Sequence, residues 1–385
     1  MTRNGYIQLA AVALLAAAIP YLLNQLSQPT RTKLSQSQMA SSEQIPKTMK
    51  ALVVQEGRKL AVQDWPVPAV GDDDILVKNV AVALNPTDYK MVYTGPGKPG
   101  TVDGCDFSGY VVKVGKNVTT PKVGDHVAGF VMGATFPDSG AFAEYVKTPA
   151  ELSWVVPEGT LTHEQASTLG CAFWTAVQGL YYRLGLVEPP EKTTKEEWIY
   201  VHGGSSAVGQ FVVQLATLSG YKVVSTASPH NHDLVKSLGA VAVFDYREPD
   251  VVNKIKAVAG DNIQLGYDTI SVKESQELSA AVIAPSGGRV IHIQSVKPEA
   301  TTRTDVDRKS TLIYSALGRA YWETPDPADR AHMVKFLKKV PALVKQGAIK
   351  PLPIKFWEGG IDAITDGLQY LREGKVSGEK IVYRV

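Results

Sequence analysis

The segment around a pair of adjacent glycines gives the clearest indication of function in this sequence. Gly203 and Gly204 follow the apolar run Trp198–His202, which is typical of a strand buried on both faces. Gly204, Ser206 and Gly209 then occupy the three positions of a dinucleotide-binding turn, with Ser206 in place of the middle glycine. Free backbone N–H groups at the start of the following helix would favour a pyrophosphate there.

The elements around this turn form a βαβ unit, which is the context that the motif requires. Residues 210–218 carry apolar side chains at helical spacing, Gly220 marks the end of that helix, and residues 223–224 begin a second strand. The alternative interpretation is a glycine turn in an unrelated α/β protein.

Ser228 lies 19 residues after Gly209, at the end of the second strand. An Asp or Glu at this position would hold the ribose hydroxyls of NADH and repel a 2′-phosphate, whereas a serine does not. Ser228, Pro229, His230 and Asn231 add hydroxyl, imidazole and amide donors at the start of the next helix. The sequence therefore predicts NADPH as the cofactor.

The rest of the second half alternates between helices and strands. Helices are expected over 232–238, 251–258 and 274–282, and strands over 241–244, 265–269 and 289–293. This alternation predicts an open, doubly wound parallel sheet of the Rossmann type with helices on both faces. Residues 310–329 give no clear pattern.

The first half is predicted to be mainly β, because short strands alternate there with glycine and proline turns. Strands are expected over 51–54, 60–63, 75–83, 109–114, 126–130 and 143–147, with loops at 85–90 and 103–106 and a helical segment over 162–184. A helix over 331–345 leads to a strand at 352–356, a helix at 361–371 and a strand at 380–385, which return to the β domain. The expected domains are therefore 48–174, 175–330 and 331–385, with the Rossmann domain in the middle.

Composition excludes several classes of protein. A length of 385 residues suggests two or three domains of about 150 residues each. The net charge of +2 gives no reason to expect a nucleic acid as partner. Two cysteines exclude a disulfide framework and a four-cysteine zinc lobe.

The N-terminal residues predict a membrane anchor. Residues 6–23 form an uncharged stretch of 18 residues, and the basic residues concentrate on its C-terminal side. By the positive-inside rule this places the following domains in the cytosol. A cleaved signal peptide and a mitochondrial presequence are the alternatives, and without an anchor the chain would be a soluble cytoplasmic protein. Residues 24–47 are rich in Ser and Gln and predict a disordered tether.

The order of motifs from residue 49 to the C-terminus resembles the medium-chain dehydrogenase/reductase superfamily. The motifs are the Gly104-x-Asp106-x-x-Gly109 loop, Val123-Gly124-Asp125-His126-Val127, Gly140-Ala141-Phe142-Ala143-Glu144-Tyr145, the cofactor turn, and Gly374-x-x-x-Gly378-x-Lys380. The resemblance implies a GroES-like, mainly β catalytic domain joined to a Rossmann domain.

Other segments are closer to one branch of that superfamily. The run Asn85-Pro86-Thr87-Asp88 is similar to the zinc-free quinone and enoyl reductases. Three further segments resemble the fungal enoyl reductases that serve polyketide synthases in trans: Ser228-Pro229-His230-Asn231, Phe244-Asp245-Tyr246-Arg247 and Ser377-Gly378-Glu379-Lys380. This resemblance implies a monomeric, NADPH-dependent enoyl reductase whose substrate is a polyketide thioester on the acyl-carrier domain of a partner synthase.

The resemblance also implies positions for the site residues. The cofactor would contact Thr87, Asp88, Tyr89, Lys90, Ser205, Ser206, Ala207, Val208, Ser228, Pro229, His230, Asn231, Tyr246, Ile293, Gln294, Ser377 and Gly378. The acyl chain would border Thr175, Ala176, Val177, Gln178, Gly179, Leu180, Tyr181 and Tyr182. For Tyr246 the alternative is a core aromatic beside a strand.

The same resemblance places Asn85, Cys105 and Cys171 where zinc alcohol dehydrogenases have their metal ligands. A carboxamide is a poor zinc ligand, so we expect no metal and two buried structural cysteines.

A metal-free site of this kind supports hydride delivery to an activated double bond, with protein groups holding the thioester oxygen. Lys90 and Thr175 are the candidates for that contact, and Tyr89 or water could deliver the proton. The alternatives are a solvated surface charge for Lys90 and a hydroxyl bonded to its own helix for Thr175. Two other functions stay open: a zinc-free quinone or alkenal reductase, and a membrane-tethered adaptor without catalysis.

Overall fold

The computed structural model of the protein describes residues 44–321 and 325–385. The predicted anchor at 6–23 and all but the last residues of the predicted tether lie outside this range. Among the residues described, no helix is both long enough and apolar enough to cross a membrane.

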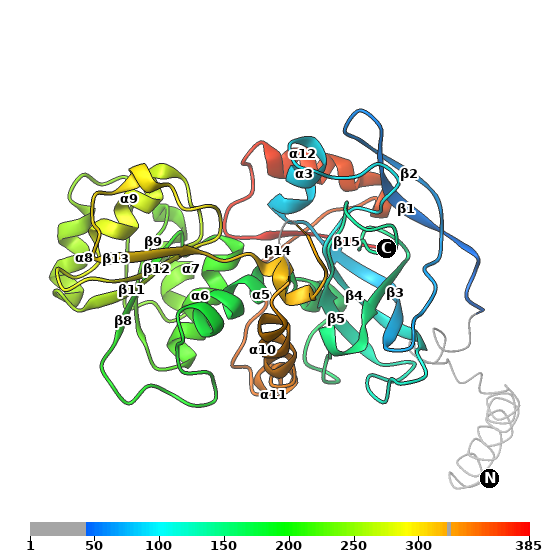
Figure 1. The fold of residues 1–385 in the computed structure, drawn as a ribbon, viewed down its shortest axis with the longest axis horizontal. Helices are drawn as coiled ribbons and strands as arrows, with labels where there is room; N and C mark the ends of the chain where they lie inside the picture. Colours follow the sequence, from blue (N-terminus) through cyan, green and yellow to red (C-terminus); the bar gives the residue numbers. More distant parts are fainter. Residues whose placement is uncertain (1–43, 322–324) are drawn as a thin grey trace, which may run out of the picture. The chain divides into compact units, whose positions relative to one another are not determined.

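The second half contains a six-stranded parallel sheet, as the alternation of helices and strands predicts (Figure 1). Its strands, in sheet order, are β10 (Ala242–Phe244), β9 (Lys222–Thr226), β8 (Trp198–His202), β11 (Ile263–Asp268), β12 (Gly288–His292) and β13 (Val306–Ser310). The carboxyl ends of these parallel strands meet at one edge, where ligands of such sheets bind.

Helices cover both faces of this sheet, and alternation along β8 assigns them. Ile199 and Val201 face the cluster that contains residues of α6 (Ala207–Leu218) and α7 (His232–Ser237). Trp198 and Tyr200 face the opposite cluster, which contains residues of α8 (Val251–Ala259) and Leu278 of α9 (Lys273–Ala281). All five residues of β8 are buried, as the apolar run predicts.

The first half forms a mainly antiparallel sheet that the C-terminus completes, with the last two strands of the chain paired in parallel. The hairpin β1 (Thr48–Gln55) and β2 (Lys59–Pro66) precedes it. The sheet order is β14 (Ile354–Phe356), β15 (Lys380–Arg384), β3 (Asp74–Ala83), β4 (Asp106–Val114), β5 (His126–Phe130) and β7 (Ser153–Val155), while β6 (Tyr145–Pro149) pairs with β3. Because β15 pairs with β3, the last strand lies beside the first strands of this sheet.

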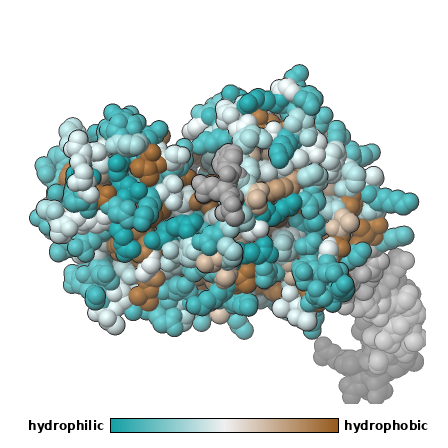
Figure 2. Space-filling view, in the orientation of Figure 1, coloured by the Kyte–Doolittle hydropathy of each residue, from teal (hydrophilic) through white to brown (hydrophobic). Residues whose placement is uncertain are grey.

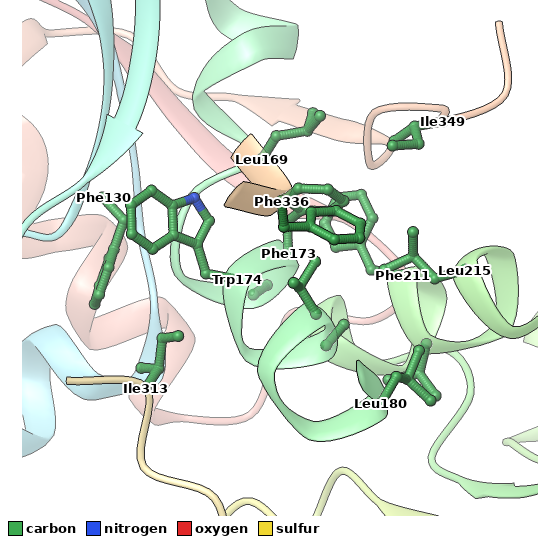
Figure 3. Close-up of a cluster of buried hydrophobic side chains, with 14 of the residues drawn as sticks. Phe130, Leu169, Phe173, Trp174, Leu180, Phe211, Leu215, Ile313, Phe336 and Ile349 are labelled. Carbon is green, nitrogen blue, oxygen red and sulfur yellow. The ribbon is translucent and has the colours of Figure 1, made fainter. Parts of the chain in front are cut away.

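One continuous apolar core joins the two halves. Phe173 of α5 (Cys171–Val177) packs edge-on against Phe211 of α6 at 5.3 Å between ring centroids. Phe173 also contacts Phe336 of α10 (Pro327–Leu337), and Phe130 of β5 contacts Trp174 at 5.5 Å (Figure 3). Apolar residues on the face shown in Figure 2 lie in small separate patches among hydrophilic ones.

Three predicted elements differ from the structure. Residues 85–90, expected as a loop, are the capped start of α3 (Pro86–Tyr93), in which Asn85 and Asp88 form a capping box. The helix expected over 162–184 is divided into α4 (His163–Ser167), α5 and the π-helical turn η2 (Gln178–Arg183). The division falls at Gly170, where a Cβ would lie 2.3 Å from Asp106 Oδ1, so the chain can pass Asp106 only as glycine.

The helix expected over 331–345 is also divided. It begins earlier, as α10, and stops at Leu337 before α11 (Val340–Lys345). Pro341 explains the break, because proline has no N–H to donate to the carbonyl of Leu337. The helix expected at 361–371 is present as the 3₁₀ turn η6 (Gly360–Ala363) followed by α12 (Ile364–Arg372). The patternless region 310–329 contains the 3₁₀ turn η5 (Ile313–Leu317).

A buried carboxylate holds η2, η5 and α10 together. Asp329 Oδ2 accepts hydrogen bonds from Gln178 Nε2 and from Arg183 Nη2, both at 2.7 Å, and also from the Ser315 hydroxyl. The Asp329 side chain is fully buried, so its charge depends on these donors.

Replacing Asp329 with alanine should lower the free energy of unfolding by about 3 kcal/mol, because Gln178 and Arg183 then lose their buried acceptor. Urea denaturation followed by circular dichroism measures the loss. Asp362→Ala is the control, since it removes an exposed pair with Lys50 and should cost less than about 1 kcal/mol. Equal effects of the two substitutions would contradict a structural role for the Asp329 contacts.

Candidate active site

A cleft of about 810 Å³ joins the carboxyl edge of the parallel sheet to the end of the antiparallel sheet. The parallel-sheet half contributes His202, Gly203, Ser205, Ser206, Ala207, Ala227, Ser228 and Tyr246, and, further along, Val251, Val252, Ile270, Val272, Glu274, Ser275, Glu277, Leu278 and Ala281. The other half contributes Leu84, Asn85, Pro86, Leu371 and residues 376–381.

The glycine turn has the geometry of a phosphate cradle. Gly203 has a φ of +75°, and a Cβ on Gly204 would lie 2.2 Å from Ser225 Oγ. A Cβ on Gly209 would lie 2.1 Å from the carbonyl oxygen of Gly203. Ser206 caps α6, because its side chain accepts a hydrogen bond from the Gly209 N–H at 2.9 Å. The serine that departs from the glycine pattern therefore stabilises the helix start, and the remaining first-turn N–H groups suit a pyrophosphate.

The predicted adenosine end forms a small polar cluster. Ser228 and Tyr246 line the cleft, and Tyr246 is 43% exposed, which rules out the core-aromatic alternative. Ser377 lies opposite: its hydroxyl contacts His230 Nε2 and Asn231 Nδ2, both at 2.9 Å. Two segments predicted separately, 228–231 and 377–378, are thus in direct contact, whereas Pro229, His230 and Asn231 do not themselves line the cleft.

A buried ammonium group lies at the other end of the cleft. Lys380 Nζ is 2.5 Å from Asn85 Oδ1 and 2.8 Å from Asp106 Oδ2, and the Lys380 and Asp106 side chains are 2% and 0% exposed. Asp106 Oδ1 accepts a hydrogen bond from the Cys171 N–H at 2.6 Å. Asn85 and Lys380 both line the cleft, so this network forms its inner wall.

Two further carboxyl groups are buried beside this pair. Asp88 accepts a hydrogen bond from the Asn85 N–H at 2.7 Å. Burial, together with the negative charge of Asp106, raises the pKa of Asp88 to about 7. Burial and the neighbouring Asp88 raise the pKa of Asp103 well above its usual range. The raised pKa values favour the protonated forms of Asp88 and Asp103.

The other residues predicted at this end lie on or near α3. Thr87 forms a short hydrogen bond with the hydroxyl of Tyr314, a residue that the sequence did not single out. Lys90 lies in the last turn of α3 with an exposed side chain, and partial burial of its ammonium group lowers its pKa. Tyr89 packs against the apolar cluster that contains Ile364 and Leu368. None of these predicted residues lines the cleft as described.

Three more residues that were predicted to contact the cofactor do not line the cleft. Val208 is the second residue of α6. Ile293 donates its N–H to Ser271 Oγ at 2.9 Å, and Gln294 Nε2 donates to the carbonyl of Ile270, also at 2.9 Å. Through these bonds Ile293 and Gln294 support the loop that carries Ile270, which does line the cleft.

The segment predicted to border the acyl chain is packed inside the protein. Thr175, Ala176, Val177, Gln178, Gly179, Leu180 and Tyr181 are buried, and none of the eight residues up to Tyr182 lines the cleft. The Thr175 hydroxyl donates to the carbonyl of Cys171 at 2.7 Å, within its own helix. Gln178 donates to Asp329, as described above, and Tyr181 contacts Leu215 and Ser219.

The structure also brings residues to the cleft that sequence reasoning missed. His202 is the last residue of β8, and Ile270 and Val272 follow β11. Both groups lie at the carboxyl edge of the parallel sheet, so the rule for ligand sites in such sheets could have found them. Lys380 belongs to the last glycine motif of the sequence, but its ion pair with Asp106, which lies far away in the sequence, could not be predicted from that motif.

The donor set at the Lys380 end does not fit zinc. Asn85 Oδ1, which would have to be a ligand beside Cys105 and Cys171, is already bound to an ammonium group. Burial raises the pKa of the Cys105 and Cys171 thiols, which favours the protonated forms. Within the described part of the chain, no group of three or more His, Cys, Asp or Glu could hold a metal. We therefore derive no chemistry from a metal, and metal independence stays a prediction.

Comparisons with known proteins agree with this geometry. Two family profiles match the chain: "Alcohol dehydrogenase GroES-like domain" over residues 71–158 and "Zinc-binding dehydrogenase" over residues 207–336. A putative zinc-dependent alcohol dehydrogenase from Rhizobium etli CFN 42 has a similar solved structure, with 26% identity and a TM-score of 0.75 over 89% of this chain and 99% of that one.

Two relatives are similar along most of the chain. The trans-enoyl reductase ACTTS2 of Alternaria alternata is 41% identical over 345 residues, which cover 88% of this chain and 99% of that protein. The trans-enoyl reductase mpsG of Macrophomina phaseolina is 37% identical over 88% of this chain and 99% of that protein. With this similarity and the two-sheet fold, the chain belongs to the medium-chain dehydrogenase/reductase superfamily, in the same family as these two trans-enoyl reductases.

Proposed function

We propose that this protein is an NADPH-dependent trans-acting enoyl reductase. Its substrate would be the α,β-double bond of a polyketide thioester carried by the acyl-carrier domain of a partner synthase. The observation that carries the proposal is the cleft itself, which runs from a glycine phosphate cradle to a wall formed by the Lys380 ammonium group. The names of the relatives that match 88% of the chain support the same reaction.

The residues of the cleft fit a dinucleotide with an extra phosphate. The cradle formed by Gly203, Gly204 and the start of α6 would hold the pyrophosphate, as the close approaches at the two glycines indicate. Ser228 and Tyr246 would hold the adenosine end, where the second strand ends in a serine instead of an acid. When bound, NADPH would supply the hydride that adds to the β-carbon of the enoyl thioester.

Lys90 is the protein group that we propose for the thioester oxygen. The Lys90 ammonium group has no hydrogen bond or ion pair to another residue within 44–321 and 325–385. It is therefore available to stabilise the negative charge that develops on the thioester oxygen. Thr175 could donate to that oxygen only after releasing the carbonyl of Cys171, so we give it a structural role instead. The proton for the α-carbon would come from Tyr89 or from water.

The partner and the location rest on the sequence. We propose that the protein acts as a monomer, receives its substrate from the acyl-carrier domain of a polyketide synthase, and is tethered to a membrane by residues 6–23 with its domains in the cytosol. A version truncated before residue 44 would stay in the soluble fraction of a cell extract, and the full chain would sediment with membranes. Recovery of the full chain as a soluble protein would refute the tether.

Reduction of an enoyl thioester should be the activity of the purified protein. The test follows NADPH absorbance with a 2-enoyl N-acetylcysteamine thioester, and product identity is checked by mass spectrometry. Simple alcohols with NADP⁺ should give no reaction. Activity with quinones or alkenals alone would favour the quinone-reductase alternative, and failure to bind NADPH in a titration would favour the adaptor.

Ser228→Asp should weaken NADPH binding by about 100-fold and change NADH binding far less. A carboxylate at the end of β9 would face the 2′-phosphate, and opposed like charges cost several kcal/mol. Isothermal titration with each cofactor measures the two dissociation constants. Ser237→Asp, on the exposed face of α7, adds the same charge away from the cleft and should alter neither. Equal losses for NADPH and NADH would mean that the phosphate binds elsewhere.

Lys90→Met should lower kcat for the enoyl thioester by about 100-fold, because the proposed donor to the developing negative charge is lost. Steady-state kinetics at saturating NADPH measures the change. Lys98→Met removes a neighbouring exposed charge after α3 and should leave kcat unchanged. An unchanged kcat in Lys90→Met would contradict a catalytic role and would show that Lys90 is a solvated surface charge.

A further inference from the structure

His202 is the one histidine that lines the cleft, among the residues described. It is the last residue of β8, directly before Gly203, and only 5% of its surface is exposed. Its ring lies 6.0 Å from the ring of Tyr246, in an edge-to-face arrangement. His202 therefore belongs to the adenosine half of the cleft, although no motif in the sequence marks it.

Contacts beneath the ring determine which nitrogen of His202 carries the proton. Nδ1 lies 2.9 Å from the Tyr200 hydroxyl and 3.3 Å from the Thr226 hydroxyl, and the two hydroxyls are 3.0 Å apart. Within the described residues, neither hydroxyl has another acceptor. All three groups are satisfied when one hydroxyl donates to Nδ1 and the other hydroxyl donates to the oxygen of the first. The proton of the neutral ring then lies on Nε2.

Burial keeps this ring neutral. It lowers the pKa of His202, while the negative charge of Asp268 opposes that effect in part. Nε2 has no hydrogen-bond partner among residues 44–321 and 325–385, so its N–H is left to donate to a ligand in the cleft. Tyr200 and Thr226 act as positioning residues, because they hold the acceptor side of the ring inward.

Three adjacent strands converge at this point. β8, β9 and β10 are neighbours in the sheet, and His202, Ser228 and Tyr246 lie at or just beyond their carboxyl ends. The nearby carboxylate of Asp245 is bound by the Arg247 guanidinium at 2.8 and 2.9 Å, which offsets its charge. An anionic group between these strand ends would meet N–H and O–H donors instead of an unpaired acid.

We propose that His202 is a specificity residue whose Nε2–H donates to the 2′-phosphate of NADPH. The inference rests on the proposed function, because it assumes that the cleft binds a nicotinamide dinucleotide. The inference goes further than the proposed function, because it assigns the selection of NADPH over NADH to His202 at the end of β8 as well as to Ser228. A hydrogen bond to a charged acceptor is strong enough for one residue to change affinity by about tenfold or more.

Two amide substitutions separate the two nitrogens of the ring. In His202→Asn the amide overlays the Nδ1 side and reaches Tyr200 and Thr226, but it supplies no donor at the Nε2 position. In His202→Gln the amide nitrogen reaches the Nε2 position and keeps a donor there. The probes are adenosine 2′,5′-bisphosphate and adenosine 5′-monophosphate, which differ only in the 2′-phosphate, and isothermal titration measures both.

His202→Asn should weaken the bisphosphate by about tenfold or more and the monophosphate by less than about twofold. His202→Gln should bind both probes within about threefold of the unchanged protein. Thermal unfolding and monophosphate affinity show that each variant is folded. Equal weakening of both probes in His202→Asn, no weakening, or equal losses in the two variants would each overturn the assignment.

The outcomes also separate this inference from the function on which it rests. If the unchanged protein binds NADPH and reduces an enoyl thioester but the variants do not discriminate between the probes, His202 is not the phosphate reader and the function stands. If the unchanged protein binds neither the bisphosphate nor NADPH, the proposed function fails first.

Discussion

The buried pair of Lys380 and Asp106 is the interaction on which the arrangement of this site depends. Both side chains are almost fully removed from water, and an ammonium or carboxylate group left alone at that depth would strongly destabilise the fold. The pair joins the last strand, β15, to β4, and Asp106 also holds the first turn of α5 through the Cys171 N–H. Lys380 reaches α3 through Asn85. Four separate segments thus meet at one ion pair.

This pair also decides what chemistry the inner wall can support. The Lys380 ammonium group is bound to the amide oxygen of Asn85 that a zinc ion would need, and Asp106 offsets the positive charge of that ammonium group. Burial raises the pKa of Asp88 and of Asp103, and a neighbouring carboxylate adds to the rise in each case. A site with these properties suits a reaction in which the cofactor performs the difficult step and the protein supplies orientation and charge.

The shared apolar core has a second consequence for the site. Because α5 and η2 pack between α6 and α10, their side chains are used to join the two sheets. Thr175 and Gln178 therefore make structural contacts where the family resemblance implied contacts with an acyl chain. The cleft is lined instead by the ends of strands, by residues of α8 and α9, and by residues 376–381.

The sequence alone determined the features that depend on local pattern. The apolar run Trp198–His202, the glycine turn and the alternation of helices and strands predicted the parallel sheet and its cradle, because backbone geometry and periodicity are encoded within a few residues. The position of Ser228 just beyond β9 was predictable for the same reason, and its role at the adenosine end of a cofactor stays a prediction. The signal for α3 was also present, as Asn85, Pro86 and Asp88 form a helix start that we interpreted as a loop.

Only the tertiary structure decided which distant residues meet. Lys380 with Asp106, Ser377 with Asn231, and Thr87 with Tyr314 are pairs from segments far apart in the chain, and no local pattern encodes such contacts. The same holds for the proton on His202, which depends on hydroxyls from two neighbouring strands. Charge states and donor directions in a buried site arise from what surrounds each group, so they exist only once the sheets have closed around it.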